Sequence, residues 1–467
     1  MPQLQQKSSM ESLSVWLILL APLASSAFPV KPGDYSTGEV SGQFWHISDL
    51  HLDFSYHLTD DHTKVCLSSK GVNASSPGIF GDFMCDSPYE LILSSIQYIK
   101  TSRQKVDFMI WTGDSPPHVP VNELSTKMVI DVIGNMTSTI RGLLPDILVF
   151  PALGNHDYWP QDQLPVSGSE VYTAVAEFWK PWLCEEALST FRKGGYYSQI
   201  YKLNGSSPPL RIISLNTNLY YSPNKETLNI TDPADQLVWL EETLKYSRQN
   251  NEKVYIIAHV PIGFLPFTIL TTAMRDGFNE KLVTIFRNYS DVIAGQFYGH
   301  THRDSIMVVL DEKDKPVGAA FVAPAVTPIK SASEQDSNNP GFRLYQYDTN
   351  SYSLKDLWHY YLNLTDANLR KEAIWKLEYV MTKEYNIQDL RPESLQELIG
   401  RFQKPRSVDF QNYYKNYVVN FDTPDGCEKL CKKRQVCAIQ HVDASSYIRC
   451  ISNFKIHNSI EDSSNFL

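Results

Sequence analysis

Aspartate, asparagine and histidine residues follow five short hydrophobic runs, each at the point where the run ends. The motifs are Asp49-Leu50-His51, Gly113-Asp114, Gly154-Asn155-His156-Asp157, His259 and Gly299-His300-Thr301-His302. Carboxylate, amide and imidazole groups in this number suit two metal ions that share one bridging carboxylate. Each motif alone is weak evidence for a metal site. A Gly-Asp pair is usually a turn, and a lone histidine is usually a hydrogen-bonded core residue. All five in one chain predict a dinuclear metal site.

The five hydrophobic runs have the composition of buried β-strands, because β-branched and aromatic residues dominate them. They cover residues 44–48, 108–112, 147–153, 254–258 and 292–298. Polar stretches with helical character lie between them, at residues 89–101, 123–143, 170–180, 235–247 and 280–289. This alternation indicates an α/β fold. Loops beyond the carboxyl ends of strands in such folds converge on one crevice, where we expect the five motifs to meet.

Three glycines, Gly113, Gly154 and Gly299, each stand directly before a candidate site residue at the end of a predicted strand. Glycine adopts backbone conformations that other residues disfavour. We therefore expect all three glycines to permit sharp turns of this kind, which would let the metal ions approach the chain closely.

The last third of the chain changes from further predicted strands to helix-like segments and clustered cysteines. Residues 306–310, 319–326 and 342–347 have the composition of strands, and we expect them to complete a second sheet. After about residue 360, three segments are helix-like and four cysteines follow; the segments are 367–385, 392–402 and 411–418. The sequence therefore predicts a catalytic domain over residues 28–360 and a C-terminal helical domain over residues 361–467.

The composition of the 467-residue chain excludes two classes of protein. A hydrophobic content of 42% supports a packed core, which argues against a disordered protein. With 42 Lys and Arg against 52 Asp and Glu, the net charge is −10 and no basic run is present. A protein that holds duplex nucleic acid needs many cationic phosphate contacts, so we expect no duplex nucleic acid as a partner.

The N-terminus has the pattern of a secretory signal. An apolar run over residues 15–24 is too short to span a bilayer, and the small residues Ser25, Ser26 and Ala27 follow it. We expect a signal peptide over residues 1–27 and a mature chain that begins near Phe28. No later run is long enough for a transmembrane helix, and the polar end of the chain resembles no lipid-anchor signal.

Glycosylation and disulfide formation agree with this secretory route. Six N-x-S/T sequons begin at Asn73, Asn135, Asn204, Asn229, Asn288 and Asn363. Of seven cysteines, Cys66 and Cys85 bracket one loop and four cluster near the C-terminus. The competing interpretation of the cluster is a zinc site, but its spacing lacks CxxC pairs. We expect a Cys66–Cys85 disulfide and two local disulfides in the cluster, with Cys184 as a buried, unreactive thiol.

The motifs as a set resemble the calcineurin-like metallophosphoesterases. Gly113-Asp114-Ser115-Pro116-Pro117-His118 and Gly154-Asn155-His156-Asp157-Tyr158 are similar more narrowly to the acid sphingomyelinase family, because most metallophosphoesterases lack a histidine at the position of His118. The resemblance implies a four-layer sandwich, with two central mixed β-sheets flanked by helices and a smaller helical, disulfide-bonded C-terminal region. It also implies the pairs Cys427–Cys431 and Cys437–Cys450.

The resemblance assigns each candidate site residue a role. It implies one metal ion held by Asp49, His51, Asp114 and His302, and a second held by Asp114, Asn155, His259 and His300. The nitrogen-rich ligand set suits two zinc ions. His118 and His156 would grip the phosphate, and one of them would protonate the leaving oxygen. For Asp157 two alternatives stay open, a carboxylate that orients His156 and a solvated loop residue.

These roles imply a secreted phosphodiesterase, and the alternative is a non-catalytic binding protein on the same scaffold. All seven ligand positions are filled, which favours the enzyme. Acid sphingomyelinase carries a saposin domain, for which the short segment between Phe28 and Asp49 leaves no room. We therefore expect small nucleotide substrates, namely nucleoside triphosphates, nucleotide-diphosphate conjugates or cyclic dinucleotides, with sphingomyelin as the alternative. We further expect a monomer that acts in the extracellular fluid or the lysosome.

Overall fold

The structure of the protein is a computed structural model that describes residues 41–203, 208–330, 337–423 and 426–452. The described residues form one compact unit. The predicted signal peptide and the sequon at Asn204 lie outside the described residues, so both stay predictions. Within the described part of the chain, no helix is both long and apolar enough to cross a membrane.

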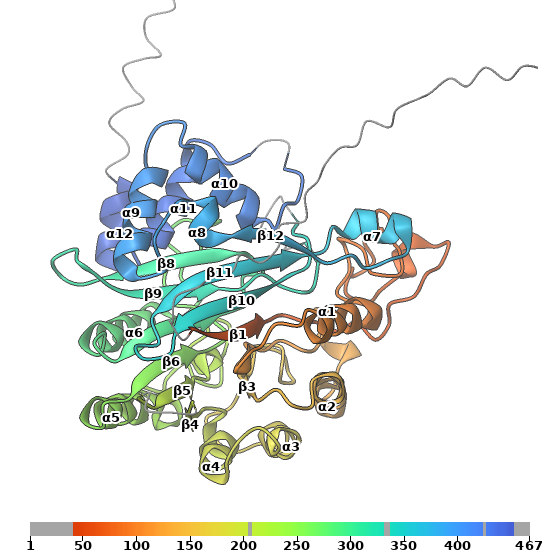
Figure 1. Cartoon of the computed structure of the whole chain (residues 1–467). Helices are drawn as coiled ribbons and strands as arrows, with labels where there is room; N and C mark the ends of the chain where they lie inside the picture. The colour runs from red at the N-terminus through yellow and green to blue at the C-terminus, as the bar shows by residue number, and fades with distance from the viewer. Residues whose placement is uncertain (1–40, 204–207, 331–336, 424–425, 453–467) are drawn as a thin grey trace, which may run out of the picture. The chain divides into compact units, whose positions relative to one another are not determined.

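The first of two six-stranded sheets contains the three parallel strands that precede the first three motifs (Figure 1). These strands are β1 (Ser41–Ile47), β2 (Phe108–Trp111) and β3 (Val149–Pro151). Three antiparallel strands extend the other edge, β10 (Gly341–Asp348), β11 (Leu354–Tyr361) and β12 (Lys376–Val380). The strand order is β12-β11-β10-β1-β2-β3.

The second sheet contains the strands that precede the last two motifs. Its members are β4 (Tyr197–Tyr201), β5 (Leu210–Ser214), β6 (Lys253–Ile257), β7 (Ile293–Tyr298), β8 (Ser305–Leu310) and β9 (Pro316–Val322). They lie in the order β4-β5-β6-β7-β9-β8, with β5, β6, β7 and β9 parallel. Both sheets are therefore mixed, as the resemblance implies.

The two sheets pack face to face through aromatic side chains. Phe44 of β1 lies with its ring centroid 5.6 Å from that of Tyr255 on β6 and 5.3 Å from that of Phe297 on β7. All three side chains are fully buried. Because aromatic rings bury a large apolar area, this layer fixes β1 against β6 and β7. The ends of these strands carry the predicted ligands, so the packing also sets the distance between the motifs.

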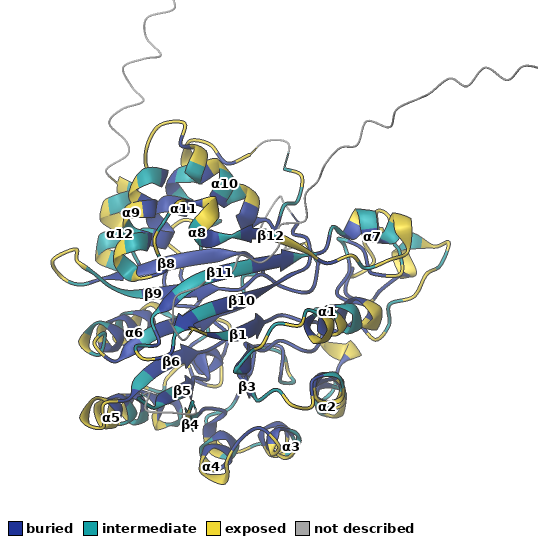
Figure 2. Cartoon of the chain, viewed as in Figure 1, coloured by how far each residue is buried: buried dark blue, intermediate teal, exposed yellow. Residues whose placement is uncertain are grey.

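Helices cover the outer faces of the sheets, and their exposed sides face outward (Figure 2). The larger ones are α1 (Tyr89–Thr101), α2 (Thr126–Leu143), α3 (Glu170–Trp179), α4 (Glu185–Gly194), α5 (Gln236–Gln249) and α6 (Asp276–Asn288). In α2, the Ser125 hydroxyl caps the helix by accepting from the Met128 backbone N–H at 3.3 Å. Val129, Ile133 and Met136 repeat at helical spacing and are buried, which explains why this segment is an amphipathic helix.

The C-terminal helices pack on the second sheet. They are α9 (Pro392–Phe402), α10 (Val408–Tyr417), α11 (Leu430–Gln440) and α12 (Ala444–Ser452), preceded by the short helices α7 (Leu364–Arg370) and α8 (Met381–Glu384). Helices α9 and α11 contact β8, and α9 also contacts β9. Strand β12 lies beyond residue 360 in the sequence but extends the first sheet. The predicted domain boundary near residue 360 therefore stays a prediction.

Two predictions about this part of the chain are wrong. Residues 342–347 belong to β10, which pairs with β1 in the first sheet and not with the second. Residues 367–385 are not one helix, because β12 interrupts them. In β12 the alternation of Leu377 and Tyr379 with charged residues has a period of two, and pairing with β11 outweighs the helical composition of the surrounding segment.

The three disulfides are those expected from the sequence. Bonds join Cys66 to Cys85, Cys427 to Cys431 and Cys437 to Cys450. Cys184 is free among the described cysteines, but the expectation that it is buried is wrong, since its side chain is exposed. The residue stands at the N-cap of α4, where its neighbours Trp182 and Leu183 fill the buried positions instead.

Candidate metal centre

The five motifs meet where the carboxyl ends of β1, β2 and β3 face those of β6 and β7. Asp114, which follows β2, lies at the centre of the group. Its Oδ2 is 3.4 Å from His51 Nε2, after β1, and 3.0 Å from His259 Nε2, after β6. One carboxylate therefore faces both halves of the site, the position that a bridging ligand requires.

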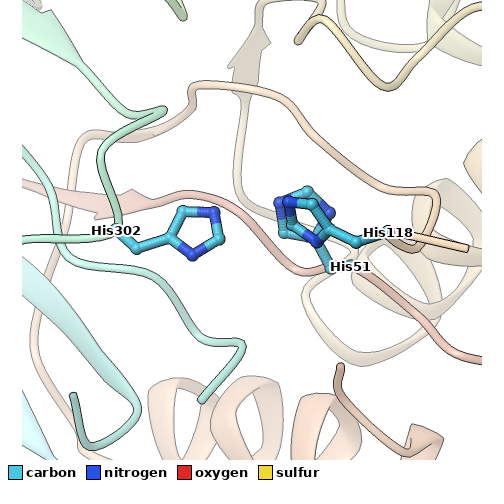
Figure 3. Close-up of side chains that lie close together, drawn as sticks. All are labelled: His51, His118 and His302. Carbon is cyan, nitrogen blue, oxygen red and sulfur yellow. The ribbon is translucent and has the colours of Figure 1, made fainter. Parts of the chain in front are cut away.

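The first half of the site gathers around Asp49. Asp49 Oδ1 lies 3.5 Å from His302 Nε2 and 3.8 Å from His51 Nε2. Figure 3 shows the imidazole rings of His51 and His302 together with that of His118, and ligand atoms from these three histidines lie within 4.8 Å of one another. The four residues expected for the first metal ion are thus brought together.

The second half gathers around Asn155, which follows β3. Its Oδ1 lies 2.9 Å from His259 Nε2 and 2.9 Å from His300 Nδ1. With Asp114 Oδ2 close to His259, these contacts unite the four residues expected for the second metal ion. The structure therefore places all seven candidate ligands in one cluster of largely buried side chains.

Backbone carbonyl groups orient two of the histidines. The Nδ1 atom of His51 lies 2.8 Å from the Pro116 carbonyl oxygen, and that of His259 lies 2.7 Å from the Thr112 carbonyl oxygen. Donation from Nδ1 leaves Nε2 of each ring free to bind a metal ion. The buried Nε2 atom of His51 has no hydrogen-bond partner among the described residues, which is costly unless a ligand occupies this position.

Asp162 is a residue that the sequence analysis missed. Its Oδ1 accepts a hydrogen bond from Asn155 Nδ2 at 2.7 Å. An amide has one oxygen and one nitrogen end, so this bond turns the Asn155 oxygen towards His259 and His300. No motif marks Asp162, because its partner Asn155 lies seven positions earlier in a loop without regular periodicity.

The backbone of the site is strained at the ligands themselves. Asp49, His51, Asp114, His300 and His302 all have positive φ angles, between 40° and 74°. Such conformations cost free energy in residues other than glycine and cluster at functional sites. The candidate ligands therefore form part of the tight turns that position them.

The prediction about the three glycines is correct for one of them. Gly113 has a φ of 93°. Gly154 and Gly299 are needed for space instead: a Cβ at Gly154 would lie 1.9 Å from Asp114 Oδ1, and one at Gly299 would lie 2.1 Å from Ser48 Oγ. The loops after β3 and β7 pack against neighbouring loops so closely that any side chain at these positions would collide with them.

Neither interpretation of Asp157 is correct. The side chain is buried, and its carboxylate accepts hydrogen bonds from the backbone N–H groups of Gly154 at 2.7 Å, Asp114 at 2.9 Å and Ser115 at 2.9 Å. Burial and the negative charge of Asp114 raise the pKa of Asp157 to about 6, against the effect of these N–H groups. Asp157 therefore fastens the loop after β3 to the loop after β2.

His118 and His156 lie beside the ligand cluster. Their ring centroids are 4.2 Å apart, and His118 is 4.1 Å from the ring of His51. The Gln161 side-chain amide donates to His156 Nε2 at 2.8 Å, while the buried His156 Nδ1 has no partner among the described residues. Burial and the neighbouring His118 lower the pKa of His156 well below its ordinary value.

The donor set fits a pair of transition-metal ions. Four imidazoles, the Asp49 carboxylate and one amide oxygen surround the shared Asp114, and nitrogen-rich sets of this kind suit zinc. Burial alone would lower the pKa of His259, but Asp114 raises it to about 9. The carboxylates thus attract positive charge to the cluster, as they would attract a metal ion.

Comparisons with known sequences decide the family. A family model described as Calcineurin-like phosphoesterase matches residues 42–304, and one described as Acid sphingomyelin phosphodiesterase C-terminal region matches residues 315–457. The chain belongs to the acid sphingomyelinase family of calcineurin-like phosphoesterases. This family is the one that the motifs predict, and within it they resemble acid sphingomyelinase-like phosphodiesterase 3a. The chain is therefore a phosphoric diester hydrolase of the metallophosphoesterase class.

Three relatives illustrate the extent of the similarity. The Homo sapiens protein named Cyclic GMP-AMP phosphodiesterase SMPDL3A is 62% identical over 92% of this chain and 95% of its own length. Acid sphingomyelinase-like phosphodiesterase 3b of Homo sapiens is 39% identical over 94% of each protein. Sphingomyelinase phosphodiesterase C of Dictyostelium discoideum is 37% identical over 88% of this chain and 93% of its own length.

Proposed function

We propose that this acid sphingomyelinase family member hydrolyses nucleotide phosphodiester or phosphoanhydride bonds with two zinc ions. The substrates would be nucleoside triphosphates, nucleotide-diphosphate conjugates or cyclic dinucleotides. The observation that carries the proposal is the complete ligand cluster around Asp114. The choice of nucleotides over lipids is supported by the similarity to a protein named Cyclic GMP-AMP phosphodiesterase.

The proposed ligands are Asp49, His51, Asp114 and His302 for one zinc ion and Asp114, Asn155, His259 and His300 for the other. When bound, such a pair lowers the pKa of water towards about 7 and stabilises negative charge on a phosphate. Deprotonated ligands are needed for this, and the Pro116 and Thr112 carbonyl groups direct Nε2 of His51 and His259 to the cluster.

His118 and His156 would supply the remaining chemistry. Both rings border the ligand cluster, so their N–H groups can donate to the oxygens of a phosphate held there. An alkoxide leaving group is strongly basic and needs a proton as its bond to phosphorus breaks. One of the two imidazoles would give that proton, and the other would hold the phosphate.

Product analysis over a substrate panel tests the proposal. The purified protein should release mononucleotide products from a nucleoside triphosphate, a nucleotide-diphosphate conjugate or a cyclic dinucleotide, and it should turn over sphingomyelin in detergent micelles much more slowly. Faster turnover of sphingomyelin would support the lipid alternative. Zinc-loaded protein that binds nucleotides and hydrolyses none of the panel would instead be a binding protein on the family scaffold.

We also propose that the protein is a secreted, monomeric glycoprotein. The three disulfides support an oxidising compartment. The sequon asparagines Asn73, Asn135, Asn229 and Asn288 are exposed, whereas Asn363 is half-buried and caps α7 by accepting from the Asp366 backbone N–H. Recovery from the culture medium as a glycosidase-sensitive monomer would support this proposal, and retention in the cytosol without glycans would contradict it.

A further inference from the structure

Asp86 is a fully buried carboxylate that belongs to none of the metal-ligand motifs. It directly follows Cys85, the second cysteine of the Cys66–Cys85 disulfide, and precedes α1. A buried carboxylate is costly to the fold unless hydrogen bonds satisfy it, so its partners reveal its role.

The main partner of Asp86 is His118. The Asp86 Oδ2 atom accepts from the His118 backbone N–H at 2.6 Å, and its Oδ1 lies 3.0 Å from His118 Nδ1. A third hydrogen bond comes from the Thr327 hydroxyl to Oδ1, also at 3.0 Å. One side chain therefore fixes both the backbone and the ring of His118. Burial alone would raise the pKa of Asp86, but His118 holds it below its ordinary range, so the carboxylate is ionised.

Residues next to Asp86 form hydrogen bonds with the backbone of two proposed metal ligands. The Ser87 backbone N–H donates to the His51 carbonyl oxygen at 3.0 Å, and the Thr327 backbone N–H donates to the Asp49 carbonyl oxygen at 3.0 Å. On its other side, the Asp86 backbone N–H donates to Ser68 Oγ at 2.9 Å, inside the loop that the Cys66–Cys85 disulfide closes. The carboxylate is thus held at a fixed place relative to Asp49 and His51.

We propose that Asp86 is a positioning residue for His118, an inference that rests on the proposed role of His118 in binding or protonating the substrate. Because Nδ1 donates to Asp86, Nε2 is the ring nitrogen left for the substrate. The side chain of His118 is 26% exposed, so that nitrogen can be reached from solvent. When Nε2–H gives its proton to a leaving oxygen, Nδ1–H stays with His118 and the carboxylate stays ionised. By accepting from Nδ1–H, Asp86 fixes the orientation of the ring and the nitrogen that the ring presents to the substrate.

The test is a double-mutant cycle with Asp86→Asn and His118→Ala. Asp86→Asn replaces one of the two accepting oxygens with an NH2 group, which cannot accept, and it removes the negative charge that faces the ring. Alone, Asp86→Asn should lower kcat on an alkyl phosphodiester by about 10- to 100-fold, with a smaller loss on a nitrophenyl ester and little change in KM. In the His118→Ala background it should cost almost nothing further, because the residue that it positions is gone.

Asp53→Asn is the matched control. Asp53 is also buried and accepts from the Ser68 backbone N–H at 3.0 Å in the same loop, but within the described part of the chain it makes no hydrogen bond or ion pair with His118. It should leave the ratio of alkyl to nitrophenyl turnover unchanged. If Asp86→Asn folds poorly, as judged by melting temperature and zinc content, Asp86→Glu serves in the same cycle, since it keeps the charge and displaces the carboxylate.

The double-mutant cycle distinguishes a failure of the positioning role of Asp86 from a failure of the proposed role of His118. Losses that add in the double mutant, or wild-type kcat in Asp86→Asn beside a large loss in His118→Ala, would overturn the positioning role alone. Wild-type kcat in His118→Ala would overturn both the positioning role and the proposed chemistry of His118. Non-additive losses that depend on the leaving group would support Asp86 as the residue that positions His118.

Discussion

Asp114 shows how much of the site depends on a single side chain. Its carboxylate contacts two histidines through Oδ2, while Oδ1 accepts from the His156 backbone N–H at 2.9 Å. Its own backbone N–H donates to Asp157, which also fastens Gly154. The backbone thus fixes the Asp114 carboxylate on two sides, which is the preorganisation that a proposed bridging ligand requires.

The roles of His118 and His156 can be separated by leaving-group dependence. Replacing the histidine that acts as the acid with alanine should slow an alkyl phosphodiester by about 10² to 10⁴-fold. It should slow a nitrophenyl ester far less, because nitrophenolate leaves without a proton. Replacing the other histidine should slow both substrates alike. Steady-state kcat for each variant on both substrates is the measurement, and equal losses throughout for both variants would leave phosphate binding as their shared role.

At the residue scale, the sequence marks the candidate ligands but not the residues that support them. Asp49 and Asn155 stand in short motifs at strand ends, where local order in the chain carries the signal. Asp86 supports His118 from 32 positions earlier, and nothing near either residue marks the pair. Contacts between distant loops depend on tertiary packing, which a single sequence does not display.

At the element scale, the loops after the strands are built around glycines that leave no room for a side chain. Gly154→Ala would place a Cβ 1.9 Å from Asp114 Oδ1 and 2.4 Å from the Asp114 backbone nitrogen. The carboxylate or the loop must therefore move, and we expect kcat to fall on the order of 10²-fold, as for a displacement of about 1 Å.

Gly142→Ala is the matched control for this variant. Gly142 lies in α2, where an added Cβ would meet nothing within 4 Å. It should retain wild-type kcat and raise the free energy of unfolding by about 0.5–1 kcal/mol, because alanine favours a helix over glycine. Kinetics and urea unfolding of both variants provide the comparison, and a fully active Gly154→Ala enzyme would show that the loops tolerate a side chain.

A second prediction at this scale concerns Asp443, which connects the C-terminal helices to α6. Its Oδ2 lies 2.6 Å from Arg287 Nη2, and Oδ1 accepts from the Ser446 backbone N–H at 3.0 Å. Burial alone would raise its pKa, but the hydrogen bonds from Ser446 and Ser445 and the Arg287 charge hold it at about 2. Asp443→Ala should therefore lower the free energy of unfolding by about 1 kcal/mol near neutral pH.

The pH dependence of this effect has a definite sign. A carboxyl group with a depressed pKa in the folded state stabilises the protein above its unfolded pKa, and that stabilisation is lost as the pH falls through the folded value. The difference between wild type and Asp443→Ala should thus shrink between about pH 4 and about pH 2. Urea unfolding of both proteins over this pH range measures the difference in free energy of unfolding, and Glu312→Ala at an exposed position is the control. A difference that stays constant with pH would exclude the ionised carboxylate as the cause.

The elements themselves were predicted unevenly for a physical reason. Strands β1, β2, β3, β6 and β7 are buried on both faces, so each is a nearly continuous hydrophobic run that the sequence displays directly. The placement of β10 beside β1 depends on antiparallel pairing across nearly the whole chain, for example Phe44 with Tyr345. Strand composition does not identify a partner at that separation.

At the scale of the whole molecule, two sheets meet so that strand ends from both halves of the chain share one site. The parallel strands of the first sheet bring Asp49, Asp114 and Asn155, and those of the second bring His259 and His300. Neither sheet alone holds a complete set of the ligands proposed for either metal ion. We therefore propose that the assembled fold binds two zinc ions on which phosphodiester hydrolysis depends.

Metal analysis of active protein tests this claim most directly. Zinc content measured by elemental mass spectrometry should be about two ions per chain, and chelation should abolish turnover of a phosphodiester until zinc is restored. Asp114→Asn, which weakens the shared ligand, should lose zinc and turnover together. Full activity in protein that contains no more than trace zinc would contradict this proposal.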